Sequence, residues 1–311
     1  MKSNCWYGRC LFLSWYCDKG TCKFCYRSTI KHKIKHPKKA KRSLASLIVE
    51  TLLCKNLNWR IEFLTGGYKI YTPKELENIL KLITSVYKEK IWINLGVIEK
   101  QDLELFKPYI KGIVSSIETT NTKLHSEICP DKPIKNYEEM FKNSKNLKRS
   151  ITIIIGLGET KEDFKTLKEF IKKYKLNRIT FYPLKPIKTT IYENKDGPPK
   201  KEYFWWIKQT RKEFPNLEII AGTTARRYKE VPELIQAGAN AFTKFPATKL
   251  FGSEQAKYIQ KSLGKQLTSN LTKLPKINWK KQINELDSNL FSEEFKKEIY
   301  EKLKEYLERM R

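Results

Sequence analysis

The amino-acid sequence predicts a parallel α/β barrel of the (β/α)8 TIM type, because eight short apolar segments alternate with helical patterns along 311 residues. Most of these segments are apolar throughout, as parallel strands are when helices cover the sheet. Eight strand–helix units are the number that closes such a barrel. The alternative is an open (β/α)6 barrel with the last two units packed differently. The expected strands are Cys10–Trp15, Arg60–Thr65, Ile91–Leu95, Gly112–Ile117, Ser150–Ile155, Arg178–Tyr182, Leu217–Ala221 and Ala241–Phe245.

Helix starts are visible between these strands. Ser43 is expected to cap a helix, because its hydroxyl can accept a hydrogen bond from a free backbone N–H. Pro73 suits a first-turn position and is expected to open a helix that ends at Tyr87. The acidic segment Thr160–Asp163 is expected to open another helix over Phe164–Tyr174.

The pattern changes after residue 264, which we expect to end the barrel and its cysteine-rich N-terminal segment. Residues 265–311 form a predicted C-terminal extension, polar and rich in loops as far as residue 290. Ser292 then caps an amphipathic helix with apolar residues on one face. This helix is expected to pack on the barrel, and docking of a partner is the alternative.

The composition restricts the possible partners. Lys and Arg number 62 against 34 Asp and Glu, a net charge of +28, which favours an acidic partner or reflects the composition of the genome. A dense basic segment, Lys31–Arg42, can guide a partner or form a solvated loop. The sequence contains no apolar run that could span a bilayer and no signal segment at its start, so we expect a cytoplasmic protein without membrane contact.

Cys17, Cys22 and Cys25 are the main chemical signal in the chain. Five of the seven cysteines lie within the first 25 residues, and clustered cysteines in a cytosolic protein favour metal over disulfides. Three thiolates can hold three irons of a four-iron cluster and leave the fourth iron open for a substrate or cosubstrate. A zinc site is the alternative, with Cys10 as a fourth ligand.

Further polar and glycine-rich motifs follow the predicted strands, at the end of a barrel where active sites lie. The pair Gly66 and Gly67 has no side chains and allows backbone carbonyls to approach an ammonium group. The pair Glu118 and Asn121 can hydrogen-bond ribose hydroxyls or an amine. The remaining motifs are the Gly156–Glu159 turn, which can lie beside an adenosine, Tyr182, which ends the sixth strand, and Phe24, which can pack on an adenine ring.

From Cys10 to Ser253 the chain resembles the radical S-adenosylmethionine (SAM) enzymes. The resemblance implies a 4Fe–4S cluster on the three cysteines, whose free iron chelates the amino and carboxylate groups of SAM. It implies cofactor contacts for Phe24, Gly66, Gly67, Glu118, Asn121, Gly156, Glu159 and Tyr182. Two features depart from the family pattern: four residues instead of three separate the first two cysteines, and Tyr68 instead of an acidic residue follows the double glycine.

The segment 118–130 resembles the biotin-synthase-like branch, whose sulfur-inserting members carry a second cluster. Bacterial lipoyl synthases likewise place two cysteines separated by four residues ahead of the radical motif, as Cys5 and Cys10 are here, and a serine near the C-terminal end. This resemblance implies an auxiliary cluster held by Cys5, Cys10, Cys129 and Ser253. The alternatives are a terminal thiol for Cys5, a core position for Cys10 and a buried loop thiol for Cys129.

The resemblance predicts a radical SAM sulfurtransferase like a component of the two-protein archaeal lipoyl synthases. The expected substrate is an octanoylated acidic carrier, H protein or a lipoyl domain, which a basic surface suits. A paralogous radical SAM partner and an electron donor such as ferredoxin are also implied. One alternative is another biotin-synthase-like reaction, methylation or cofactor biosynthesis; the other is a non-catalytic iron–sulfur or zinc protein that binds RNA through its charge.

Overall fold

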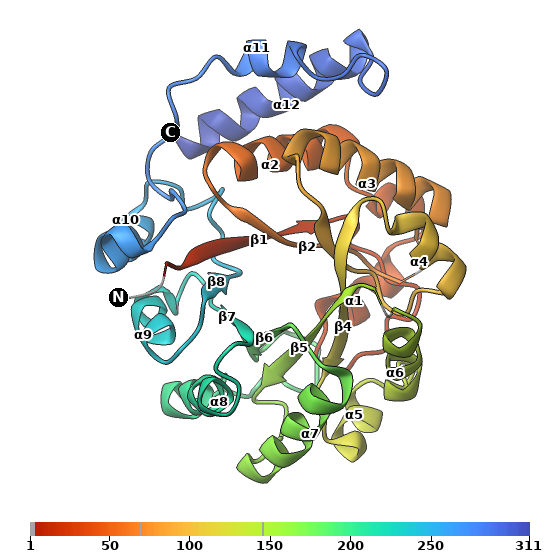
Figure 1. Cartoon of the computed structure of the whole chain (residues 1–311), viewed down its shortest axis with the longest axis vertical. Helices are drawn as coiled ribbons and strands as arrows, with labels where there is room; N and C mark the ends of the chain where they lie inside the picture. Colours follow the sequence, from red (N-terminus) through yellow and green to blue (C-terminus); the bar gives the residue numbers. More distant parts are fainter. Residues whose placement is uncertain (1–3, 69, 145) are drawn as a thin grey trace.

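The computed structural model describes residues 4–68, 70–144 and 146–311 and contains a closed barrel of eight parallel strands in sequential order (Figure 1). The predicted (β/α)8 class is therefore confirmed, and the open six-stranded alternative is wrong. The strands are β1 (Trp6–Phe12), β2 (Arg60–Thr65), β3 (Ile91–Asn94), β4 (Ile110–Glu118), β5 (Lys148–Ile155), β6 (Arg178–Pro183), β7 (Glu218–Gly222) and β8 (Ala241–Thr243).

The first strand starts four residues earlier than expected and ends three residues earlier. Trp6 pairs with Ala241 of β8, so the start of β1 closes the barrel. The expected end of the strand, residues 13–15, has left the sheet: Ser14 forms an antiparallel bridge with Lys41 instead. As a result Cys5 precedes the strand and Cys10 lies within it.

Helices surround the barrel in the ring that Figure 1 shows. The predicted caps are confirmed: the Ser43 side chain accepts a hydrogen bond from the Ser46 N–H, and Thr72 forms a capping box with Glu75. The helix after Thr160–Asp163 has the expected bounds. The helices are α1 (Tyr26–Ile30), α2 (Leu44–Asn56), α3 (Pro73–Tyr87), α4 (Lys100–Phe106), α5 (Thr122–Ile128), α6 (Ile134–Asn143), α7 (Phe164–Tyr174), α8 (Lys200–Glu213), α9 (Val231–Gln236), α10 (Glu254–Leu263), α11 (Trp279–Asn284) and α12 (Glu293–Met310).

The C-terminal segment packs on the outside of the barrel. Leu267 forms a parallel bridge with Cys5, and the indole N–H of Trp59 donates to the carbonyl of Asn270 at 2.7 Å. The terminal helix α12 lies along α2 in an outer layer, as expected (Figure 1). Within the described residues, no helix has both the length and the apolar character needed to cross a membrane.

Candidate active site

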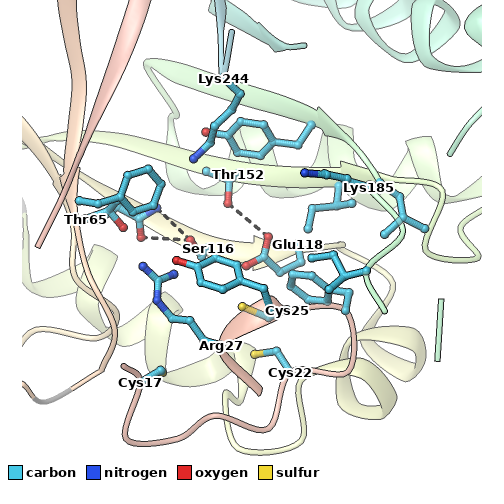
Figure 2. A pocket seen from close by; sticks show the side chains of 18 of the residues that line it. Cys17, Cys22, Cys25, Arg27, Thr65, Ser116, Glu118, Thr152, Lys185 and Lys244 are labelled. Atoms are coloured by element: carbon cyan, nitrogen blue, oxygen red, sulfur yellow. Dashed lines mark hydrogen bonds between the residues drawn. The ribbon is translucent and has the colours of Figure 1, made fainter. Parts of the chain in front are cut away.

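A cavity of about 570 Å³ opens at the carboxyl ends of the barrel strands (Figure 2). The loop between β1 and α1 forms one wall with Cys17, Cys22 and Cys25. Residues at the ends of the strands form the floor and the opposite wall, among them Thr65, Ser116 and Thr152. The predicted cysteines and several predicted strand-end residues are thus brought together in one site.

The three cysteines are half-buried and are presented by a short loop. Cys17 Sγ accepts a hydrogen bond from the backbone N–H of Tyr68 at 3.3 Å, and the N–H of Cys25 donates to the carbonyl of Cys22 at 3.1 Å. Among the described residues, no three His, Cys, Asp or Glu side chains are gathered closely enough to hold a single metal ion. A zinc site requires such convergence, whereas each thiolate of a 4Fe–4S cluster binds a different iron.

Gly67 is needed for the position of the cysteine loop. A Cβ at Gly67 would lie 1.6 Å from the carbonyl oxygen of Tyr16, so only glycine lets the loop cross here. Gly66 lines the cavity, and a Cβ there would lie 3.2 Å from Leu13 Cβ. The glycine pair therefore places Cys17 above the end of β2, a role that sequence reasoning did not foresee.

Cys22 lies beside Cys129 and Lys132. A hydrogen bond from the Cys129 thiol lowers the pKa of Cys22 despite its burial, and the positive charge of Lys132 acts in the same direction. The same hydrogen bond and burial raise the pKa of Cys129. Burial also raises the pKa of Cys25. Cys22 is therefore favoured as a thiolate ligand, whereas Cys129 remains a thiol that supports it.

Glu118 lies inside the cavity at a bulge that ends β4, with a left-handed φ of 63°. One carboxylate oxygen accepts from Lys132 Nζ at 3.3 Å, and the other accepts from the Thr152 hydroxyl at 3.4 Å. This arrangement holds an acceptor at the end of the fourth strand, in the place predicted for hydrogen bonds to ribose or an amine.

Three other predicted cofactor contacts have structural roles. Asn121 caps α5 through Leu124 N–H and donates to Asp163 at 3.0 Å, which uses both ends of its amide. The Glu159 carboxylate accepts the backbone N–H groups of the turn that begins at Gly156. Gly156 has a left-handed φ of 105° and packs against Leu184. None of these three lines the cavity, and β5 contributes Ile154 instead.

Tyr182 and Phe24 do line the cavity, as expected. The Tyr182 hydroxyl donates to the carboxylate of Glu62 at 2.8 Å. Burial and the charge of Glu62 raise the pKa of Tyr182, so it remains a neutral donor. Phe24 packs beside Cys22 and Ile154 and provides an apolar face next to the cysteines.

The four residues expected to hold an auxiliary cluster are not brought together. Cys5 is buried at the amino-terminal end of β1, where its backbone pairs with Gln266 and Thr268. Cys10 points into the barrel and donates to Glu62 at 2.8 Å, and burial together with that charge raises its pKa to about 12. Ser253 caps α10, and Cys129 adjoins Cys22. The burial of Cys10 also removes it as the fourth zinc ligand.

Sequence reasoning missed the basic side chains of the cavity. Lys19, Arg27, Lys132, Lys185 and Lys244 line it, with Glu118 as the only carboxylate among the described lining residues. In a chain with 62 Lys and Arg, composition and spacing do not distinguish these residues from the others. For Lys185 and Lys244 the one available signal was their position shortly after strands β6 and β8.

The site suits a three-thiolate cluster with an anionic ligand beside it. Arg27 lines the cavity together with the thiols, and its Nε atom is buried without a hydrogen-bond partner in the described part of the chain. A carboxylate or a cluster sulfide is the type of acceptor that a guanidinium binds. The cysteines and Arg27 would therefore hold a cluster and the carboxylate of SAM on one wall.

Comparison with known proteins agrees with this geometry. The chain is 40% identical to an uncharacterized protein of Methanocaldococcus jannaschii, over 96% of this chain and 87% of that protein. It is 26% identical to the biotin synthase of Thermotoga petrophila, over 57% of this chain and 60% of that enzyme. The crystal structure of methylornithine synthase (PylB) shares the fold, with a TM-score of 0.65, 16% identity and coverage of 77% of this chain and 72% of that one.

The family profile covers the cysteine loop and the strands that form the cavity floor. The profile of the radical SAM superfamily matches residues 14–171, about half of the chain. This family implies a 4Fe–4S cluster and SAM, for which the cavity supplies thiolates and a guanidinium. The chain belongs to the radical SAM superfamily and has biotin-synthase-like relatives.

Proposed function

We propose that this enzyme cleaves SAM at one 4Fe–4S cluster, held by Cys17, Cys22 and Cys25, in a reaction of the cofactor-biosynthesis type. The observation that carries the proposal is that the three thiols share one cavity with Glu118 and Tyr182. When bound, the cluster and SAM would supply hydrogen abstraction from a substrate C–H bond, with methionine and 5′-deoxyadenosine as the products of SAM. The biotin synthase relative supports this class of reaction.

The cavity residues bind and orient the ligands, and they exclude water. Glu118 provides an acceptor for hydroxyl or amine donors, and its ion pair with Lys132 fixes the carboxylate. Phe24, Ile154 and Tyr182 provide an apolar surface over the centre of the cavity. Exclusion of water protects a reactive intermediate from side reactions.

Anaerobic reconstitution tests the proposal. Protein that carries about four irons per chain should release equal amounts of 5′-deoxyadenosine and methionine from SAM when a one-electron reductant such as dithionite is present. Cys17→Ala, Cys22→Ala and Cys25→Ala should each abolish this cleavage, and Cys54→Ala, in a core position on α2, should not. The proposal would be overturned if the protein bound zinc in place of iron, or if the iron-loaded protein left SAM intact.

Lipoyl formation on an octanoylated carrier is the finer candidate, together with a paralogous partner and a ferredoxin-like electron donor. The net charge of +28 favours it, because it suits an acidic carrier. Sulfur insertion needs a sulfur donor, and the four residues expected to hold a second cluster lie in separate environments. For this reason we rank lipoyl formation second.

Iron content and products separate the two candidates. Reconstituted protein with an octanoyl-carrier peptide, alone and with a paralogue, should yield 5′-deoxyadenosine without thiolated peptide if the first candidate holds. About eight irons per chain together with thiolated peptide would establish lipoyl formation.

A further inference from the structure

The cavity is more basic than its cofactors require. Among the described residues, five basic side chains and one carboxylate line it. An oxidised 4Fe–4S cluster on three thiolates carries a single net negative charge and SAM a single net positive charge, so the cofactors cancel each other. The remaining positive charge on the lining is therefore available to another ligand.

Three of the five cations already have partners near the cysteines. Lys132 pairs with Glu118, and Lys19 donates to the carbonyl of Asp131. Arg27 donates to the carbonyl of Ser14 at 3.0 Å and lies over the ring of Tyr26. These cations stabilise the cysteine loop and face the cofactor side of the cavity.

Lys185 and Lys244 differ from these three. Across residues 4–68, 70–144 and 146–311, neither donates a hydrogen bond to a protein acceptor, and neither forms an ion pair with a carboxylate. Figure 2 shows both on the side of the cavity away from Cys17, Cys22 and Cys25, with Thr152 and Glu118 between. A ligand held by these two lysines would therefore face the cluster across the cavity.

Lys244 is held over the cavity by its backbone and by two aromatic rings. It directly follows β8 with a φ of 64°, a left-handed conformation that is unfavourable for a residue other than glycine. Its Nζ atom lies 4.5 Å from the ring centroid of Phe12 and 5.4 Å from that of Tyr182. Cation–π contacts position the ammonium group and leave its N–H donors free for an anion.

We propose that Lys244, assisted by Lys185, anchors an anionic group, a carboxylate or a phosphate, of a small substrate that lies opposite the cluster. The inference rests on the proposed function, because it assumes that SAM and the cluster occupy the cysteine side. It specifies the class of substrate: a small molecule with at least one negative charge, which shares the cavity of about 570 Å³ with the cluster and SAM. An uncharged acyl chain would leave both lysines without a partner.

Anion binding by the reconstituted protein tests this site. Inorganic phosphate and succinate are titrated at constant ionic strength against chloride, with SAM present and no reductant, and binding is followed by calorimetry and by the rise in Tm. Wild-type protein should bind at least one of the two probes. Preference for phosphate would indicate a phosphate ester, and preference for succinate a carboxylate.

Lys244→Gly is the decisive variant, because glycine removes the cation and accepts the left-handed backbone. Its Tm in chloride should equal or exceed that of the wild type, which excludes misfolding as the cause of lost binding. The Kd for the preferred probe should rise by about tenfold or more. Lys244→Arg should retain binding, and Lys185→Met should weaken it by a smaller factor.

Lys208→Met is the matched control, because Lys208 is exposed on α8 and lies outside the lining of the cavity. Its loss of one positive charge should leave anion binding and SAM cleavage unchanged. The anion site would be refuted if wild type and Lys244→Gly bound the probe equally well. It would also be refuted if the wild type preferred neither probe over chloride. SAM cleavage by the wild type, measured separately, decides the proposed function, so the two failures are distinguishable.

Discussion

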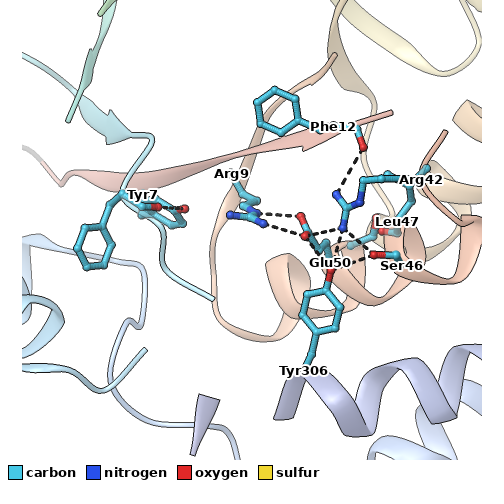
Figure 3. A network of polar contacts seen from close by, with 10 residues as sticks. Tyr7, Arg9, Phe12, Arg42, Ser46, Leu47, Glu50 and Tyr306 are labelled. Atoms are coloured by element: carbon cyan, nitrogen blue, oxygen red, sulfur yellow. Dashed lines mark hydrogen bonds and ion pairs between the residues drawn. The ribbon is translucent and has the colours of Figure 1, made fainter. Parts of the chain in front are cut away.

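The network around Glu50 is predicted to be the strongest polar anchor between the barrel and the C-terminal helix (Figure 3). Glu50 on α2 is buried and accepts two hydrogen bonds from Arg9 of β1, at 2.7 and 2.8 Å. Arg42 donates to the same carboxylate at 2.7 Å, and the hydroxyl of Tyr306 on α12 donates at 3.1 Å. Glu50→Gln keeps the side-chain volume and removes the charge that both guanidinium groups share.

The free energy of unfolding that Glu50→Gln would lose can be estimated in two ways. Burial alone would raise the pKa of Glu50, but the charges and hydrogen bonds of Arg9 and Arg42 outweigh it and lower the pKa from 4.5 to about 2. That lowering is equivalent to about 3 kcal/mol of stabilisation. Breaking a buried ion pair from one side costs about 3–5 kcal/mol. We therefore expect Glu50→Gln to reduce the free energy of unfolding by about 3 kcal/mol.

Urea unfolding, followed by tryptophan fluorescence, measures this loss. At pH 7 the midpoint should fall by about 1 M, for a slope of about 3 kcal/mol per M. Because the folded pKa is lowered, the stabilisation is present above the unfolded value of 4.5 and disappears as the pH falls to about 2. The difference between wild type and variant should shrink over the same interval. Glu104→Gln, which removes the exposed pair with Lys107, is the control and should not move the midpoint. A Glu50→Gln midpoint within error of the wild type would refute the reasoning.

Three further predictions concern the site and the tail. Gly67→Ala should prevent incorporation of the cluster, measured as iron per chain, because its Cβ would collide with the Tyr16 carbonyl. Gly252→Ala, which adds a methyl group 3.6 Å from its nearest neighbour at a left-handed φ of 66°, is the control for a general loss of stability and should keep the iron content. Glu118→Gln should weaken SAM binding and leave the iron content unchanged, because Glu118 lies between the cysteine loop and the two lysines of the proposed anion site and pairs with Lys132. Unaltered SAM affinity in an equilibrium binding measurement would contradict this role. Tyr306→Phe should lower the free energy of unfolding by about 1–2 kcal/mol, because its hydroxyl accepts from Arg42, donates to Glu50 and bonds Ser46, and these three hydrogen bonds are lost. Faster proteolysis near α12 should accompany the loss.

The barrel could be predicted from the sequence because its strands are short, apolar and separated by capped helices. Strand β2 and helix α7 have the expected bounds, since a buried strand and an acidic helix start are local signals. The first and last residues of strand β1 could not be predicted in the same way. The run from Cys10 to Trp15 is largely apolar, but Leu13 and Ser14 leave the sheet and lead into the cysteine loop. The path of that loop depends on Gly67 and Lys41 from elsewhere in the chain.

Part of the site could be predicted from the sequence because the barrel brings residues that follow its strands to one rim. Cys17, Cys22, Glu118 and Tyr182 lie at the ends of strands, and the barrel brings all such ends to one rim. Asn121 and Glu159 also follow strands, but both satisfy nearby backbone N–H groups. Short polar side chains near a chain turn often bind the turn itself, and sequence alone does not tell which donor a carboxylate will accept from.

Strand geometry separates Cys5 from Cys10, two of the four residues predicted to hold a second cluster. In a β-strand successive side chains point to opposite faces, so two residues separated by an odd number of positions cannot share a face. Cys5 and Cys10 are five positions apart, which is also roughly 16 Å along an extended chain. Cys5 therefore packs outside against the C-terminal segment and Cys10 points to Glu62 inside the barrel. The same spacing in a loop would allow both thiols to reach one cluster. The position of Trp6, which starts β1 and pairs with β8, thus places Cys5 and Cys10 in separate environments.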